Sequence, residues 1–479
     1  MSRGGSAKIV GGSYSCPINA TTMALGAVLP YLLFEAMNDL AINPHTHDSL
    51  MRSTADFRSD NPDLLKRWEP YAEWVNHRLV EGVQPFGKST AEAIGPALTA
   101  YDSGGTAYTG VNLASQEYLS LASHPDVLRA VTEAVTKYGV HSAGSAALQG
   151  NTAESLALEQ ELAAFLGMAD CTVFSTGWGA GFGIVKTLAR PTDHIVLDVL
   201  AHACLQEGAR AASPNIHHFP HCSTKSVERR VRRIRAANPN AGILVVTETL
   251  FSMDSDTPDI RGVQEACHRY GATLVVDVAH DLGAIGAGGR GVLGAQDMWG
   301  KADVVMGSFS KTFASNGGFV ACNNPALKQA LRYNCGPLTF TNAITPMAAA
   351  VVRACIRIIT GSEGEERRER LMRNILHLRG ALEDAEFEVL GNPSAIVPVV
   401  LGDSALSRLI TKHCLRLGGI VNLVEYPAVS RNTSRWRLQV MADHTKEQID
   451  AFVDAACKAR KLGRAEWAQL ESAGMSPGL

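Results

Sequence analysis

Residues 302–311 have the sequence ADVVMGSFSK, in which an apolar run ends in small polar residues and a lysine. A short apolar run of this kind predicts a buried strand of a parallel sheet. Similar runs precede it, with helical patterns between them, at CTVF (171–174), HIVLDV (194–199), GILVVTE (242–248) and ATLVVDV (272–278). This order predicts an α/β fold, a mostly parallel sheet covered by helices on both faces.

The segments on either side of this region predict two further parts. Residues 1–105 have weak periodicity and predict an N-terminal helical extension, residues 106–342 a large ligand-binding domain, and residues 343–479 a smaller C-terminal α+β domain. The apolar run Met23–Phe34 contains Pro30 and is shorter than the roughly 20 residues that a membrane span needs. We therefore expect a buried or interfacial helix there and a cytoplasmic protein, although the apolarity of the run leaves contact with a membrane surface open.

The composition excludes several classes of protein. Hydrophobic residues make up 46% of the 479 residues and charged residues 19%, which excludes extended disorder. The net charge of −3, without a long basic tract, argues against a nucleic-acid partner. The ten cysteines form no Cys-x-x-Cys pair, so we expect reduced thiols and no metal site.

Ligands of open α/β sheets bind beyond the carboxyl ends of the strands, so the residues that follow each apolar run are the candidates for a site. The turn 175–180 leads into a helix, whose free N–H groups could bind a phosphate. The alternative interpretation is an ordinary strand-to-helix turn without a ligand. The next two runs end near polar residues that fit either a site or simple capping, namely Asp198 with His202 and Glu248 with Ser252.

The last two runs carry the strongest candidates. Asp277 ends one strand with His280 three residues later, and Lys311 follows the next strand. Burial lowers the pKa of a lysine and makes it a competent Schiff-base nucleophile toward an aldehyde cofactor. Each residue also has an ordinary interpretation, as a satisfied buried carboxylate, a packed histidine or a surface lysine. The chain order of phosphate-type turn, aspartate and lysine favours a site.

One glycine-rich segment resembles a dinucleotide fingerprint without its context. Residues 286–291 match G-x-G-x-x-G, but they do not join a strand directly to a helix. We interpret them as a mobile loop.

Together these motifs resemble the α-oxoamine synthases, a family of fold-type I pyridoxal-phosphate (PLP) enzymes. The resemblance extends from about residue 112 to residue 456 and rests on separated motifs in one order. They are NLASQEYL (112–119), the Gly177–Trp178 pair, TETLFSMDSD (247–256), VVDVAHD (275–281), GSFSK (307–311), FTNAITP (340–346) and a segment from Tyr426–Pro427 through RWR (435–437) to His444.

The resemblance implies a role for each matching residue. Lys311 is implied as the PLP lysine, Asp277 as the partner of the ring nitrogen, His280 as the partner of the phenolic oxygen and His202 as the residue stacked on the ring. The other implied cofactor residues are Gly177, Trp178, Ser252 and Ser308, with Thr341 or Asn342 reaching the phosphate across a dimer interface. Arg435, Gln116 and Glu248 are the implied substrate residues.

The implied reaction is a decarboxylative Claisen condensation. A small amino acid joins an acyl thioester, carried by CoA or an acyl carrier protein, and gives an α-amino ketone. A carboxylate at the ring nitrogen makes PLP an electron sink, and an arginine orients the amino-acid carboxylate. The resemblance also implies a homodimer. The motifs fix neither the amino acid nor the acyl chain.

Three other interpretations compete with this one. A fold-type I aminotransferase would use the same aspartate and lysine, although the D-x-A-H and S-M-D segments fit the synthases better. A non-catalytic partner subunit would have no need of Lys311. A nicotinamide dehydrogenase has only the glycines at 286–291 in its favour.

Overall fold

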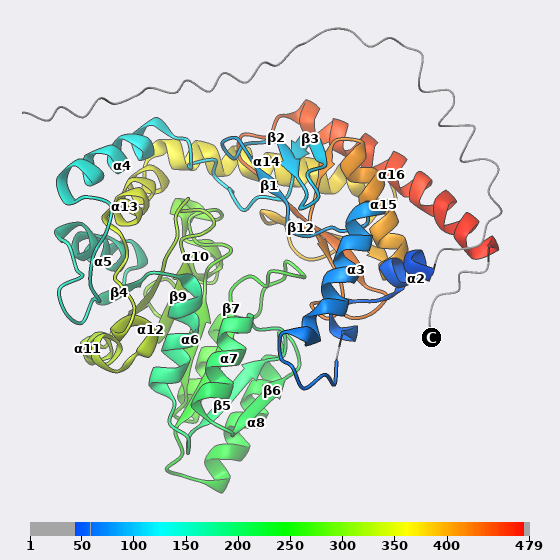
Figure 1. Ribbon diagram of the computed structural model, residues 1–479. Coiled ribbons are helices and arrows are strands. Elements are labelled where there is room, and N and C mark those ends of the chain that lie inside the picture. The colour runs from blue at the N-terminus through cyan, green and yellow to red at the C-terminus, as the bar shows by residue number, and fades with distance from the viewer. Residues whose placement is uncertain (1–43, 58, 474–479) are drawn as a thin grey trace, which may run out of the picture. The chain divides into compact units, whose positions relative to one another are not determined.

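The computed structural model describes residues 44–57 and 59–473, which belong to one compact unit, Asn43–Leu479. A seven-stranded sheet has the order β4-β10-β9-β8-β7-β5-β6 and forms the centre of the large domain (Figure 1). Its strands are β4 (Asp170–Phe174), β5 (His194–Asp198), β6 (Ile216–Phe219), β7 (Ile243–Glu248), β8 (Thr273–Asp277), β9 (Val304–Ser308) and β10 (Gly318–Cys322). Only β10 runs antiparallel to its neighbours. The predicted fold class is confirmed.

Helices cover both faces of this sheet. Alternate strand residues pack toward opposite sides: Ile195 and Leu197 lie in one core cluster and Val196 in the other. Because both faces are buried, the strands have continuous apolar runs rather than an alternating pattern. One face packs against α6 (Gly177–Leu188), α7 (Ala203–Ala212), α11 (Pro325–Asn334) and α12 (Gly336–Thr339), the other against α5 (Ala153–Leu166), α8 (Thr224–Ala237) and α9 (Ile260–Arg269).

The C-terminal part is built around an antiparallel sheet of order β11-β12-β15-β14. The strands are β11 (Glu388–Val389), β12 (Ile396–Gly402), β14 (Leu423–Val424) and β15 (Ser434–Gln439), and the helices α14 (Ser362–Asp384), α15 (Ser404–Arg416) and α16 (Lys446–Ser472) accompany them. Residues 346–360 form a separate helix, α13, which packs on α4 (Pro125–Tyr138) and α5. The sequence placed the start of the small domain at residue 343, but α13, which follows that position, packs on helices of the large domain.

The N-terminal region is helical only in part. Its helices are α2 (Pro44–Met51) and α3 (Glu69–Val80), with the short 3₁₀ turns η1 (Thr54–Asp56) and η2 (Lys66–Trp68). The strands β1 (Ser89–Thr90), β2 (Ala97–Tyr101) and β3 (Ala107–Asn112) form a sheet with β13 (Gly419–Ile420). The expected boundary at residue 105 thus falls inside the β2–β3 hairpin. Met23–Phe34 lies outside the described residues.

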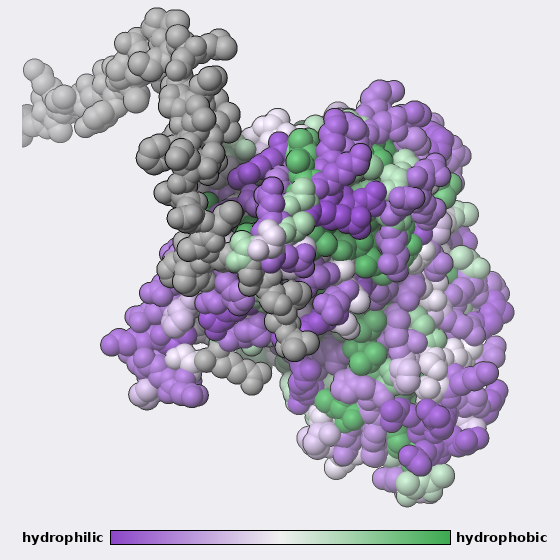
Figure 2. Space-filling model, turned by 90° about the vertical axis from the view of Figure 1, so that its right-hand side faces the viewer, coloured by the Kyte–Doolittle hydropathy of each residue, from purple (hydrophilic) through white to green (hydrophobic). Residues whose placement is uncertain are grey.

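Among the described residues, no helix is both long and apolar enough to cross a bilayer. The face shown in Figure 2 is mostly hydrophilic, with separate hydrophobic areas. The cytoplasmic location stays a prediction.

The glycine-rich segment 286–291 does not form a dinucleotide-binding turn. It contains the 3₁₀ turn η3 (Ala287–Gly289) and leads into the short helix α10 (Gly291–Ala295). The backbone N–H of Val292 donates to Asp281 at 2.7 Å, so this segment is anchored to the loop that follows β8.

Candidate active site

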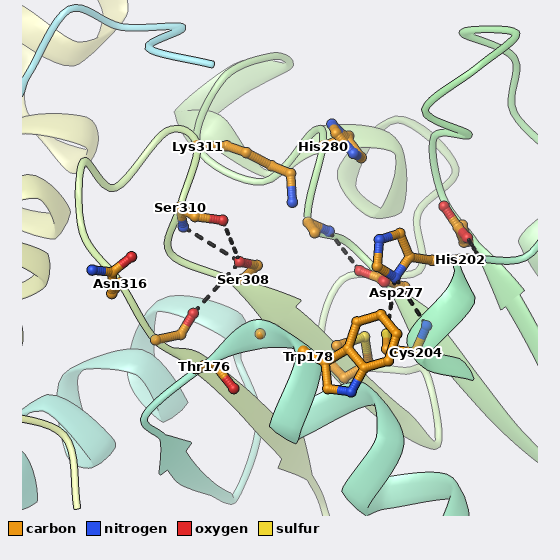
Figure 3. Close-up of a pocket in the computed structure, with 15 residues that line it drawn as sticks. Thr176, Trp178, His202, Cys204, Asp277, His280, Ser308, Ser310, Lys311 and Asn316 are labelled. Carbon is orange, nitrogen blue, oxygen red and sulfur yellow. Dashed lines mark hydrogen bonds between the residues drawn. The ribbon is translucent and has the colours of Figure 1, made fainter. Parts of the chain in front are cut away.

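The carboxyl ends of the central strands surround a cavity of about 260 Å³ (Figure 3). The structure brings eight of the predicted site residues to its wall: Gly177, Trp178, His202, Glu248, Asp277, His280, Ser308 and Lys311. Thr176, Cys204, Ala279, Met306, Ser310, Asn316 and Gly317 complete the lining. Parallel strand order explains this convergence, because it brings strand ends that are distant in sequence to one edge of the sheet.

One side of the cavity has the composition of a phosphate site. Helix α6 begins there at Gly177, and its N-cap Thr176 accepts the N–H of Gly179 through its side chain at 2.9 Å. The first N–H groups of a helix have no partner within it, so the α6 N-terminus favours an anion. The hydroxyls of Ser308 and Ser310 lie 2.8 Å apart on the same side. A Cβ at Gly177 would approach Ser308 to 2.5 Å, so this close packing requires glycine.

Lys311 and Asp277 are the charged pair of the cavity. The Lys311 side chain extends between the hydroxyl residues and the side that holds Asp277 and His280 (Figure 3). Burial lowers the pKa of the Lys311 amine, and the Asp277 carboxylate opposes that shift. Burial likewise raises the pKa of Asp277, against the effect of Lys311 and His202. The Asp277 side chain is fixed by the N–H of Ala279, which donates to it at 2.9 Å.

His202 is held in one orientation by the start of α7. It is the N-cap of that helix, and its Nδ1 accepts the backbone N–H of Cys204 at 3.3 Å. Nδ1 therefore carries no proton, and the neutral ring has its hydrogen on Nε2. Burial lowers the pKa of His202, which favours this neutral form. The backbone N–H of His202 donates to Glu248, a buried carboxyl whose pKa burial raises well above its usual range.

His280 has a buried partner that the sequence interpretation missed. The Tyr118 hydroxyl lies 3.0 Å from His280 Nδ1, and both side chains are buried. Burial, together with the charge of Lys311, holds the pKa of His280 well below its usual range. Tyr118 belongs to the NLASQEYL motif, but nothing in that motif indicates that its tyrosine, rather than Gln116, reaches the site.

Arg435 lies on the wall of a neighbouring cavity rather than on the wall of this one. Arg435 Nη1 donates to the Asp254 carboxylate at 2.5 Å and to the Met253 carbonyl at 3.2 Å, and Arg435 does not line the cavity. Arg437 lies two residues further along β15, on the same face of the strand. Arg437 is not on the cavity wall either, but its charge lowers the pKa of Lys311, His202 and His280. Its buried Nε has no hydrogen-bond partner within the described protein.

The other predicted residues also lie outside the cavity wall: Gln116, Ser252, Thr341 and Asn342. Thr341 donates to the Pro337 carbonyl at 2.6 Å, and the Asn342 amide lies 3.2 Å from His141. Both residues are exposed.

A second polar cluster lies behind the site and has the geometry of ion pairs. His221 Nδ1 lies 2.9 Å from Asp198, and its Nε2 lies 2.9 Å from Asp256. Although burial opposes a charge there, the two carboxylates raise the pKa of His221 to about 12. The protonated form of His221 is therefore favoured, as an ion pair with both carboxylates.

Comparison with known proteins agrees with this geometry. Residues 108–455 match the family model for aminotransferase class I and II. The chain therefore has the fold and belongs to the class that this model defines.

Its relatives within that class are α-oxoamine synthases. The chain is 32% identical over 421 residues to serine palmitoyltransferase of Sphingomonas paucimobilis, covering 87% of this chain and 97% of the relative. It is 31% identical over 353 residues to 2-amino-3-ketobutyrate coenzyme A ligase of Escherichia coli, covering 73% and 87%. An S. paucimobilis serine palmitoyltransferase structure with a bound PLP–myriocin aldimine is 31% identical, with a TM-score of 0.78 and coverage of 84% and 100%.

The chain belongs to the α-oxoamine synthase family. The predicted family is thus confirmed, and with it the class of enzyme, a PLP-dependent acyltransferase.

Proposed function

We propose that this enzyme binds PLP at Lys311 and condenses a small amino acid, serine in the first instance, with a fatty acyl-CoA. The observation that carries the proposal is the shared cavity, in which a half-buried lysine and a buried aspartate lie with the N-terminus of α6. PLP needs an amine for its aldehyde, a carboxylate for its ring nitrogen and an anion site for its phosphate. Lys311, Asp277 and the N-terminus of α6 would supply these three.

The residues that line the cavity fit PLP group by group. The α6 N-terminus with Ser308 and Ser310 would hold the phosphate, and Asp277 the ring nitrogen. The neutral ring of His202 would stack on the cofactor, with Ala279 opposite, while His280 would bond the phenolic oxygen. When bound, PLP supplies an electron sink for the electron pair released at the amino-acid Cα.

The chain's own residues would then orient the substrate and move its proton. Arg437 would bind the amino-acid carboxylate bidentately, which directs the Cα–H bond toward the Lys311 amine. Lys311, with its lowered pKa, would take that proton. The His280 imidazole, hydrogen-bonded to Tyr118, would stabilise the developing charge. Carbon–carbon bond formation at the acyl carbonyl releases the thiol, and loss of carbon dioxide leaves the α-amino ketone.

A second cavity, of about 700 Å³, suits the acyl donor. Its wall includes His202's neighbours Ala201 and Ala203, so it lies beside the first cavity. Arg210 and His218 give it a polar region suited to phosphate groups. Its apolar lining suits a pantetheine or acyl chain and consists of Val199, Leu200, Met253, Pro427, Ala428 and Val429.

The choice of serine is supported by the extent of similarity. The alignment with a serine palmitoyltransferase spans 421 residues, against 353 for the ketobutyrate ligase. The similarity to the serine palmitoyltransferase therefore extends over more of this chain than the similarity to the ligase.

We further propose a homodimer in which Thr341 or Asn342 reaches the phosphate of the other subunit. Two large apolar side chains support a protein interface here: Phe340 is 87% exposed and Leu148 is 86% exposed. Leu148 lies on the segment that pairs with Asn342 through a bridge at Ser145. Sedimentation of the holoenzyme tests this, since a monomeric active species would contradict it.

The experiment that tests the function is an absorption titration of the purified protein with PLP, followed by product analysis. We expect a visible band in the wild type that borohydride reduction fixes to Lys311, and its absence in Lys311→Ala. Serine with palmitoyl-CoA should then yield carbon dioxide and an amino ketone, with glycine and alanine as comparison substrates. Amino-group transfer to a keto acid without the thioester would contradict the proposal.

A further inference from the structure

The loop 426–433 forms one wall of the proposed acyl-donor cavity. Pro427, Ala428, Val429, Ser430 and Thr433 line that cavity. The loop joins β14 to β15, the strand that also carries Arg437. The position of this loop therefore bears on the width of the donor cavity.

The helical extension contacts this loop at its beginning. Arg78 of α3 and Arg408 of α15 meet at Glu425, which immediately precedes the loop. Arg408 Nε donates to Glu425 Oε2 at 2.7 Å, and Arg78 Nη2 lies 3.6 Å from Glu425 Oε1. All three side chains are buried, and Arg408 also donates to the carbonyl of Leu50 in α2. The start of the loop is thus fixed to both helices of the extension.

A second contact lies near the middle of the loop. Arg431 Nη2 lies 3.4 Å from the Asp56 carboxylate, and its guanidinium lies 4.3 Å from the centre of the Tyr426 ring. The backbone N–H of Ser53 donates to Asp56 at 2.7 Å, which orients the carboxylate. Asp56 therefore stabilises one arrangement of the loop from the side of the extension.

We infer that the extension, through Asp56 and Arg78, positions the loop 426–433 and so sets the affinity for the acyl donor. This inference rests on the proposed function. Asp56 and Arg78 are positioning residues, because neither lines the cavity. Their effect should fall on the donor and spare the amino acid, whose site lies at Lys311 and Arg437.

The test is a charge reversal at the partly exposed pair. Arg431→Glu should raise the KM for palmitoyl-CoA about threefold to fivefold, the range expected for loss of a surface ion pair. The KM for serine, and the spectral change that serine alone produces, should stay unchanged. The double variant Asp56→Lys with Arg431→Glu should restore the donor KM. High salt should reduce the difference between wild type and Arg431→Glu.

A matched pair elsewhere provides the control. Arg269 and Glu228 join α9 to α8, with side-chain exposures of 58% and 35% against 61% and 32% for Arg431 and Asp56. Arg269→Glu should leave the donor KM unchanged. Arg78→Lys, which keeps the charge in the buried cluster, should raise the donor KM with an unfolding temperature close to that of the wild type.

Two results would overturn the inference while the wild type makes the amino ketone. One is an unchanged donor KM in Arg431→Glu; the other is an equal rise in the KM values of serine and donor. A wild type that binds PLP and forms no amino ketone refutes the proposed function instead, and the inference with it.

Discussion

Replacement of Arg437 tests which arginine of β15 recognises the amino-acid carboxylate. Arg437 is half-buried, its buried Nε lacks a partner within the described protein, and its charge acts on the groups around the cavity. A hydrogen bond to a charged group contributes about 1.5 to 3 kcal/mol, so a bidentate pair contributes about 3 kcal/mol or more. With tenfold in affinity for each 1.4 kcal/mol, Arg437→Ala should weaken serine binding about a hundredfold.

Arg435→Ala is the matched control on the same face of the same strand. It removes the ion pair with Asp254, so we expect an unfolding free energy lower by about 1 to 3 kcal/mol. Serine affinity should change by less than about threefold, because this guanidinium already has its partners. Arg437→Lys should fall between the wild type and Arg437→Ala, since an ammonium keeps the charge without the planar pair of donors.

The assay is a spectral titration of the holoenzyme with serine in the absence of the acyl donor. This separates amino-acid binding from every later step. Arg437→Ala should also raise the pKa of Lys311, because the arginine lowers it in the wild type. The reasoning is refuted if Arg435→Ala weakens serine binding as much as Arg437→Ala, or if Arg437→Ala leaves that binding within threefold of the wild type.

Three further predictions concern single residues. Lys311→Ala should abolish product formation while PLP still binds reversibly, as dialysis and absorption spectra would reveal; turnover within tenfold of the wild type would contradict the role of the lysine. Asp277→Asn should reduce kcat by at least about a hundredfold, because a neutral amide does not stabilise a protonated ring nitrogen; a kcat within threefold would exclude that role. Burial lowers the pKa of His444 to about 4, so the stability contributed by its neutral form is complete above about pH 6.5 and decreases as the pH falls toward 4. That loss is about 3 kcal/mol at most, and denaturant unfolding of His444→Gln should show a flatter dependence between pH 6.5 and 4 than the wild type.

The central fold was predictable because its signal is local. Each buried strand of the parallel sheet is an apolar run, and chain order fixes the edge at which Asp277 and Lys311 meet. The strands β6 and β10 were not predicted. β6 carries two adjacent histidines at 217 and 218 that weaken its apolar pattern, and β10 follows closely on the lysine loop. The sheet formed by β1, β2, β3 and β13 was also missed; its β3–β13 pairing joins residues more than 300 positions apart, which no local pattern indicates.

The candidate site was predictable for residues at strand ends and less so elsewhere. His202, Asp277 and Lys311 follow apolar runs directly, so their convergence needs only the parallel topology. The choice between Arg435 and Arg437 depends on distance along one strand, since the two share a face. Likewise Tyr118 reaches His280 through a long-range contact that no local pattern indicates.

Most of the titratable side chains around the cavity favour their neutral forms. Burial lowers the pKa of His202 and, more strongly, that of His280, and it raises the pKa of Glu248, so each group favours its neutral form. The pKa of Lys311 is lowered, so its amine gives up a proton more readily than an exposed lysine. In the proposed mechanism two groups would provide the fixed charges: the Asp277 carboxylate toward a cationic ring and the Arg437 guanidinium toward a carboxylate. Lys311 could then exchange a proton with substrate without a change in either fixed charge, as an acid–base residue between a cofactor and an amino acid requires.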